Sequence, residues 1–152
     1  MCREIEHKFA VRSDAFKPLA VARLHIRQAY LCFGPPVTLR LRQKDDTYIM
    51  TVKGPSSRGG TTRTEVEKPL SRAEFEALWP LHRGHIIEKY RYLVPWKGRM
   101  IEVDEFVRPR PGLVIAEIEL REGESLPELP SWIGEELTGR PEYQNSYMAR
   151  HG

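Results

Sequence analysis

Cysteine and histidine are scarce in this chain, and so are the motifs that use them. Two cysteines among 152 residues are too few for a disulfide framework or a thiolate metal site. The five histidines form no His-Glu-x-x-His motif, which excludes a zinc site of that kind. Gly59 and Gly60 are not followed by the Gly-Lys-Ser/Thr of a Walker loop, so a P-loop nucleotide site is excluded as well.

Long apolar runs are also missing. No stretch approaches the roughly 20 apolar residues of a membrane span, and Arg3, Glu4 and Glu6 replace the apolar core of a secretory signal. We therefore expect a cytoplasmic protein with no membrane partner. A net charge of +3 does not argue for nucleic acid as a partner. With 40% hydrophobic residues, the chain suits one domain over residues 1–152.

Alternation of apolar and polar residues is what the chain has in abundance, and it is typical of strands. The pattern predicts eight strands, at residues 3–11, 24–31, 37–42, 48–53, 61–68, 85–94, 100–107 and 113–121. A capping box at Ser71 predicts a helix to about Trp79. The Pro-rich chain after residue 124 is expected to be irregular, with short helices near Trp132 and from about Glu142 to Arg150. A mainly-β, antiparallel fold follows.

The first strand carries an unusual row of charges. Glu4, Glu6 and Lys8 share one of its faces. Such a row is costly in a dry core unless metals or counter-charges complete it. Later strands supply many charges on one face: Arg40, Arg42, Lys53, Arg63, Glu65, Glu67, Lys89, Arg91, Glu102, Asp104, Glu117, Glu119 and Arg121.

This charged face has two interpretations. An antiparallel sheet with one wet face is the ordinary one. However, acids and bases are segregated into i, i+2 pairs on different strands, and helices can cover the apolar faces from outside. We therefore favour a closed eight-stranded antiparallel β-barrel, a tunnel with a polar, charged lumen and helices packed outside.

A lumen of this kind suits one class of ligand. Arginine binds phosphate oxygens through two parallel hydrogen bonds, and rows of bases bind polyanions. Carboxylate clusters bind hard cations such as Mg²⁺ or Mn²⁺. Enclosure strengthens both, because an opposite-charge pair at about 4 Å is worth roughly 1 kcal/mol in water and roughly 4 kcal/mol at an effective dielectric of 20. The expected ligand is a metal–phosphate complex.

The ordered motifs resemble those of the CYTH superfamily, also called triphosphate tunnel metalloenzymes. Its Glu-x-Glu-x-Lys signature is matched by Glu4, Glu6 and Lys8. The resemblance continues through residues 28–31, 40–42, 51–54, 63–67, 89–91, 102–104, 116–120 and 143–145. It covers nearly the whole chain, whose compact length is most similar to the short bacterial members.

The resemblance implies an eight-stranded tunnel that acts on triphosphates with the help of metal ions. The triphosphate would be held by Lys8, Arg40, Arg42, Lys53, Lys89 and Arg91. Two Mg²⁺ or Mn²⁺ ions would be bound or oriented by Glu4, Glu6, Glu65, Glu67, Asp104, Glu117 and Glu119. In similar short members a C-terminal helix closes one end of the tunnel, which would be the stretch with Tyr143, Asn145 and Tyr147 here. A homodimer is a family-level expectation.

The expected reaction is hydrolysis of a phosphoanhydride, most simply of inorganic tripolyphosphate to pyrophosphate and phosphate. The catalytic candidates are Glu4, Glu6 and Lys8, and the choice between Glu4 and Glu6 for orienting water stays open. Class IV adenylyl cyclase and thiamine triphosphatase are alternatives within the family, and a non-catalytic polyphosphate-binding module is the alternative from another class. Tyr30 either reaches the lumen or is half-buried, and Arg58 could reach a tunnel mouth.

Overall fold

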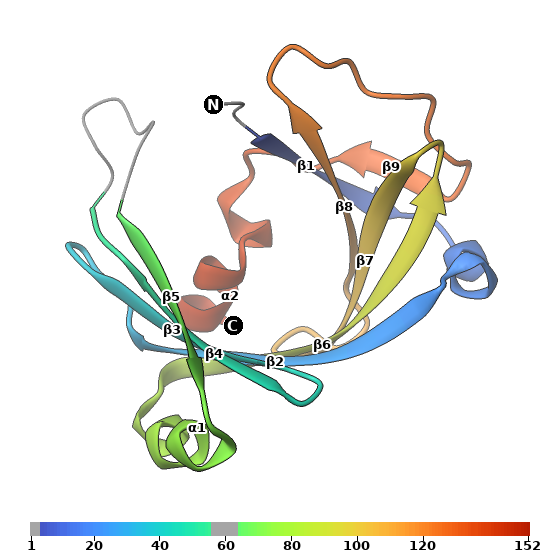
Figure 1. Ribbon diagram of the computed structural model, residues 1–152. Helices are drawn as coiled ribbons and strands as arrows, with labels where there is room; N and C mark the ends of the chain where they lie inside the picture. The colour runs from blue at the N-terminus through green and yellow to red at the C-terminus, as the bar shows by residue number, and fades with distance from the viewer. Residues whose placement is uncertain (1–3, 56–63) are drawn as a thin grey trace.

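One antiparallel sheet of nine strands makes up most of the protein in the computed structural model, which describes residues 4–55 and 64–152. The strands are β1 (Glu4–Val11), β2 (Ala22–Cys32), β3 (Thr38–Lys44), β4 (Thr47–Lys53), β5 (Glu65–Leu70), β6 (Arg83–Trp96), β7 (Arg99–Arg108), β8 (Val114–Arg121) and β9 (Ile133–Glu136). Their order across the sheet is β5-β4-β3-β2-β6-β7-β8-β1-β9. The sheet curls strongly, so that β3, β4 and β5 face β7, β8 and β1 across its concave side (Figure 1).

Tight turns allow long strands to pair along most of their length. The hairpin between β6 and β7 turns at Lys97 and Gly98, whose φ angles of 46° and 76° match the twist of the flanking strands. Asp45, with a φ of 50°, begins the turn between β3 and β4. These hairpins fix the register and therefore decide which side chains share a face.

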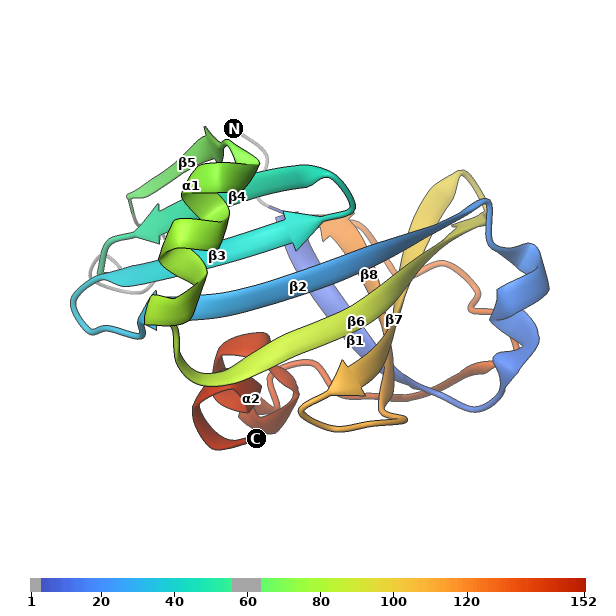
Figure 2. The same ribbon diagram turned by 90° about the horizontal axis from the view of Figure 1, so that it is seen from below.

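The main apolar core lies on the convex side of the sheet. Ile101, Val103 and Ile118 are almost fully buried there, together with Phe16 of the 3-10 helix η1 (Asp14–Leu19) and with Trp132. Helix α1 (Arg72–Leu78) also lies on the convex side, and the 3-10 helix η2 (Trp79–Leu81) follows it (Figure 2). The charged residues of the strands lie on the opposite, concave side, where a second and smaller apolar cluster is confined to the end covered by the C-terminal helix.

Helix α2 (Asn145–His151) lies on the concave side, after the 3-10 helix η3 (Pro141–Tyr143). Met148 and Ala149 of α2 are buried against Ile87 of β6. Gly84 permits this approach, because a Cβ atom there would lie 2.2 Å from the carbonyl oxygen of Ala149. Arg110 donates hydrogen bonds to the carbonyl oxygens of Glu142 and Gly152. We call the end that α2 covers the closed end, and the opposite end, at the turn between β6 and β7, the open end.

The structure corrects three features of the predicted barrel. All eight predicted strands are present, but the count of eight is wrong because the Pro-rich segment after Trp132 forms β9 instead of a helix. Closure is not confirmed, since β5 and β9 are the edges of the sheet over the described residues and β9 occupies the edge of β1 that β5 would need. The expectation that helices pack outside holds for α1 and is wrong for α2.

The helices of residues 4–55 and 64–152 are too short or too polar to cross a lipid bilayer. The C-terminal stretch does lie across one end of the concave face, as the resemblance implied for Tyr143, Asn145 and Tyr147. Arg58, which was expected to reach a tunnel mouth, and Arg63 both lie outside the described residues.

Candidate active site

The register of the sheet brings the predicted site residues to one face. Directly opposite residues of antiparallel strands point to the same side. Opposite partners on the concave face are Glu6–Glu119, Lys8–Glu117, Glu102–Glu117, Arg91–Asp104, Gln28–Arg42, Arg40–Thr51, Thr51–Glu67 and Lys53–Glu65. Lys89 joins them because it is two residues from Arg91 on β6.

A buried group of three charges forms the centre of this face. Arg91 donates two hydrogen bonds to Asp104, with Nε–Oδ1 and Nη2–Oδ2 distances of 2.8 and 3.0 Å. Lys89 Nζ lies 2.7 Å from Asp104 Oδ2 and donates to Asn145 Oδ1 of α2 at 3.1 Å. The side chains of Lys89 and Asp104 are 0% and 2% exposed. Because the buried carboxylate of Asp104 contacts both bases, it holds Lys89 and Arg91 in one geometry.

The protonation of this group follows from burial and charge. Burial alone would raise the pKa of Asp104, but the charges of Lys89 and Arg91 outweigh it and hold that pKa well below its usual range. For Lys89 burial dominates and lowers the pKa of the ammonium group. Burial, together with the charges of Arg40 and Arg91, lowers the pKa of Arg42 to about 10. Arg42 remains charged at neutral pH, and a bound anion would relieve the smaller part of this lowering, which comes from repulsion by Arg40 and Arg91.

The acids gather around β1 and β8. Lys8 Nζ lies 3.7 Å from Glu117 Oε1 and 4.0 Å from Glu6 Oε1, and it donates to the carbonyl oxygen of Tyr143 at 3.2 Å. Burial, with the negative charge of Glu117, raises the pKa of Glu6 to about 7, and Glu119 adds to the effect. One ammonium group does not offset the repulsion among these carboxylates.

The repulsion among the carboxylates of Glu6, Glu117 and Glu119 shows that these residues fit a divalent cation. Carboxylate oxygens are the ligands that Mg²⁺ and Mn²⁺ prefer, and a cation would remove the repulsion at Glu6. Among the described side chains, no three acidic, histidine or cysteine groups already stand together as a complete metal cage. The residues therefore fit a hard cation that the substrate's own oxygens would help to bind.

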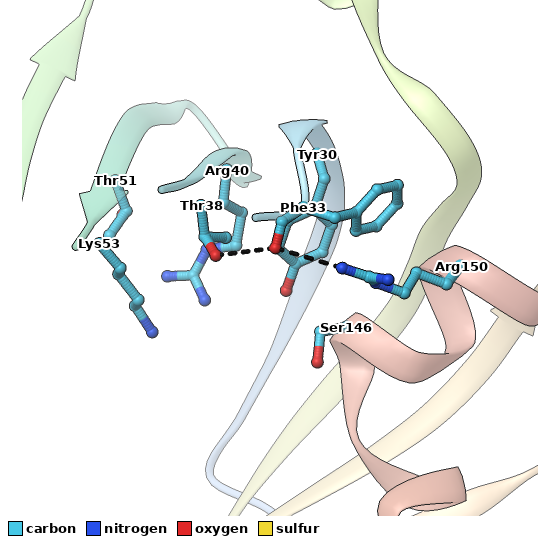
Figure 3. A pocket seen from close by; sticks show the side chains of 8 residues that line it. All are labelled: Tyr30, Phe33, Thr38, Arg40, Thr51, Lys53, Ser146 and Arg150. Carbon is cyan, nitrogen blue, oxygen red and sulfur yellow. Dashed lines mark hydrogen bonds between the residues drawn. The ribbon is translucent and has the colours of Figure 1, made fainter. Parts of the chain in front are cut away.

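Among the cavities that reach the concave face, one lies at each end. The cavity at the open end has a volume of about 620 Å³, and its charged lining consists of Lys44, Arg99, Glu102, Glu117 and Glu119. The cavity at the closed end has a volume of about 270 Å³ and is lined by bases and hydroxyl groups, including Arg40 and Lys53 (Figure 3). The predicted bases and acids are thus distributed unequally along the face.

Three predicted metal-binding residues are not part of the acid cluster that the structure describes around β1 and β8. Glu65 and Glu67 are exposed on the edge strand β5, on the wall opposite β1. Glu4 pairs through its backbone with Arg121 of β8, and its side chain lies outside what the structure describes. The structure thus brings Glu6, Glu117 and Glu119 together and leaves Glu65 and Glu67 across the sheet.

Four polar residues belong to this face although they were not among the predicted site residues. Gln28 is fully buried and accepts a hydrogen bond from Arg42 Nε at 3.0 Å. Thr51 is 1% exposed, and Asn145 contacts Lys89. Period-two spacing from the charged positions could have indicated Gln28 and Thr51. The family resemblance placed Asn145 at one end of the tunnel, whereas no sequence signal indicated Arg150.

Tyr30 was left open between two environments, and the structure decides between them. Its side chain belongs to the lining of the closed-end cavity, and the residue is 5% exposed. The ring stacks on Phe33, with centroids 5.2 Å apart. Tyr30 therefore reaches the concave face and is buried there.

Comparison with known proteins agrees with this geometry. The chain is 42% identical to an inorganic triphosphatase of Acetivibrio thermocellus over 151 residues, covering 99% of this chain and 96% of that protein. It is 35% identical to an inorganic triphosphatase of Nitrosomonas europaea, with 96% of each chain covered. A crystal structure of an inorganic triphosphatase superposes with a TM-score of 0.75 at 32% identity, covering 98% of this chain and 95% of that one. Residues 2–150 match the model of the CYTH domain, and the protein belongs to the CYTH family.

Proposed function

We propose that this protein is an inorganic triphosphatase that hydrolyses tripolyphosphate to pyrophosphate and phosphate with Mg²⁺ or Mn²⁺. The observation that carries the proposal is that bases and clustered acids share one concave face in a chain 42% identical to a curated inorganic triphosphatase. Bases alone would serve any polyanion. Clustered acids would repel phosphate unless a cation intervenes, so they support metal-assisted chemistry.

The bases bind and orient the phosphate chain in this proposal. Lys8, Arg40, Arg42, Lys53, Lys89 and Arg91 are the binding residues. Phosphoryl transfer depends mainly on positioning and on stabilising charge. Asp104 supports both, because its hydrogen bonds and ion pair hold Arg91 and Lys89 in place before the substrate arrives.

The acids provide the metal-binding part of the site. Glu6, Glu117 and Glu119 would hold the cation, with Glu4, Asp104, Glu65 and Glu67 completing the set that the family resemblance implies. A bound cation would offset phosphate charge and lower the pKa of a water molecule. Glu4 or Glu6 would orient that water for in-line attack.

The proposal is tested by measuring phosphate release from tripolyphosphate, ATP and thiamine triphosphate, each with Mg²⁺ and with Mn²⁺. We expect release from tripolyphosphate that stops when EDTA is added. Cyclic AMP with pyrophosphate as the products of ATP would identify a cyclase instead. Tight binding of tripolyphosphate without release under any condition would establish a non-catalytic binding module and overturn the proposal.

A further inference from the structure

The cavity at the closed end has a lining that differs from the rest of the concave face. Its polar lining comes from Tyr30, Arg40, Thr51, Lys53, Ser146 and Arg150. Within the described residues no carboxylate lines it. Figure 3 shows Arg40 and Lys53 reaching towards it from the sheet, while Ser146 and Arg150 approach it from α2. A volume of about 270 Å³ surrounded by bases and hydroxyls suits a small anion.

Two buried polar atoms of this lining have no hydrogen-bond partner among the described residues. They are Oγ1 of Thr51, which is 1% exposed, and Nε of Arg40. Buried polar groups in folded proteins are nearly always hydrogen-bonded, so each unpaired one requires an explanation. A ligand with acceptor oxygens would satisfy both atoms.

Arg150 brings a further base to this cavity from a different part of the chain. Its Nη2 donates to the carbonyl oxygen of Gly34 at 2.9 Å, and its guanidinium lies 4.9 Å from the centroid of the Phe33 ring. Ser146 is four residues earlier on α2, so both side chains lie on the same side of the helix. These contacts fix the guanidinium at the wall of the cavity and leave other N–H groups of its fork for an anion.

We propose that the closed-end cavity binds a terminal phosphate group without a metal ion, and that Thr51, Ser146 and Arg150 are anion-binding residues alongside Arg40 and Lys53. This inference rests on the proposed function for the identity of the substrate, and it adds which part of the substrate goes where. Phosphate at the acid-rich open end needs a cation to offset the carboxylates, whereas phosphate at the closed end meets bases only. The substrate must therefore offer an unsubstituted terminal phosphate at this end.

Calorimetric titration of the full-length protein with pyrophosphate in excess EDTA tests the proposal. Wild type is expected to bind. Arg150→Gln should weaken binding about tenfold, because a lost charge-assisted hydrogen bond has roughly that effect. Thr51→Val should weaken binding several-fold, and Thr51→Ser, which keeps the hydroxyl, should bind nearly as wild type. Arg72→Gln is the matched control, since it removes the same charge from the exposed start of α1.

Thr51→Val keeps the test independent of α2, which Arg150→Gln could loosen through its lost bond to Gly34. Equal pyrophosphate affinity in wild type, Arg150→Gln and Thr51→Val would overturn the proposal. So would an absence of metal-free binding in a wild type that hydrolyses tripolyphosphate with Mg²⁺. Metal-free binding that depends on Thr51 and Arg150, in a protein with no hydrolysis, would support this site and overturn only the proposed function.

Discussion

The closed end of the concave face is lined by bases without a described carboxylate, whereas the open end is lined by three carboxylates together with Lys44 and Arg99. At the closed end, Arg40 and Arg150 line a cavity with hydroxyl groups and no described carboxylate. At the open end, Glu117 and Glu119 help to raise the pKa of Glu6 to about 7, after burial itself. Between the two ends, Asp104 is closely paired with Lys89 and Arg91, and Glu102 pairs with Arg91 at 3.1 Å, so that two acids balance two bases.

This difference shows how a folded protein can prepare for ligands of both signs. A buried surplus of one charge is costly, so it marks a place where a ligand of opposite sign will complete the structure. The closed end is prepared for an anion and the open end for a cation. The balanced group in the middle keeps the two surpluses apart.

The largest expected effect comes from breaking the balanced centre with Asp104→Asn. This change leaves Lys89 buried without its counter-charge and Arg91 with Glu102 alone, and should lower the free energy of unfolding by about 3 kcal/mol or more. Guanidinium chloride unfolding measures it. Glu128→Gln is the control, because it removes an exposed ion pair with Lys97 and should cost under about 1 kcal/mol. Equal losses in both variants would contradict a structural role for the centre.

The next effect concerns the acid end. Glu117→Gln keeps the shape of the side chain and removes one carboxylate charge beside Glu6 and Lys8. We expect the kcat of tripolyphosphate hydrolysis to fall about a hundredfold or more, since metal-assisted charge stabilisation is worth several kcal/mol. Initial rates of phosphate release measure the change. The exposed Glu122→Gln is the matched control, and comparable rates in the two variants would remove Glu117 from the proposed site.

A matched pair of arginine substitutions compares the two ends directly. Arg40→Gln removes a base with an unpaired, buried Nε at the closed end, and should raise KM for tripolyphosphate about tenfold. Arg99→Gln, at the open end, should change KM less than about twofold, because Glu124 already pairs with Arg99. Substrate titrations of both variants measure the effect. A larger change for Arg99 would reverse the assignment of the two ends.

The smallest effect concerns the pH dependence of the metal-free protein. Because the pKa of Glu6 is raised from 4.5 to about 7, the folded state binds more protons than the unfolded state between these values. The free energy of unfolding should therefore fall as pH rises from 4.5 to 7, by about 1 kcal/mol after allowance for solvent screening.

Glu6→Gln removes this titrating group and should flatten the dependence, which urea unfolding at a series of pH values measures. The variant should also be slightly more stable than wild type at pH 7 in EDTA, since it ends the repulsion from Glu117. A dependence that is equally steep in wild type and Glu6→Gln would show that other groups cause it.

Alternation in the sequence was sufficient to predict the strands and the charged face, because the side-chain period of a strand is fixed by covalent geometry. Lys89 and Arg91 share a face for this reason, and the pairing of Arg91 with Asp104 adds Asp104 to that face. The residues that carry chemistry on this face remain a proposal.

What alternation could not predict depends on contacts between distant residues. Strand β9 forms because Leu137 N donates to the carbonyl oxygen of Lys8 at 2.7 Å and Arg12 N donates to that of Trp132 at 2.8 Å. Strand β9 has only four residues, and nothing in their sequence indicates that they pair with β1. The position of α2, and with it Arg150, depends on the close approach of Ala149 to Gly84, which is 65 residues before Ala149 in the chain.

The open edge at β5 has a consequence for solubility. An unpaired strand edge offers free N–H and C=O groups to a second chain and so invites aggregation. Charged side chains and proline are the usual protection, and β5 carries Glu65, Glu67, Lys68 and Pro69 in succession around one apolar residue. Because the curled sheet does not close on itself over the described residues, these four residues disfavour the pairing of its exposed rim with another molecule.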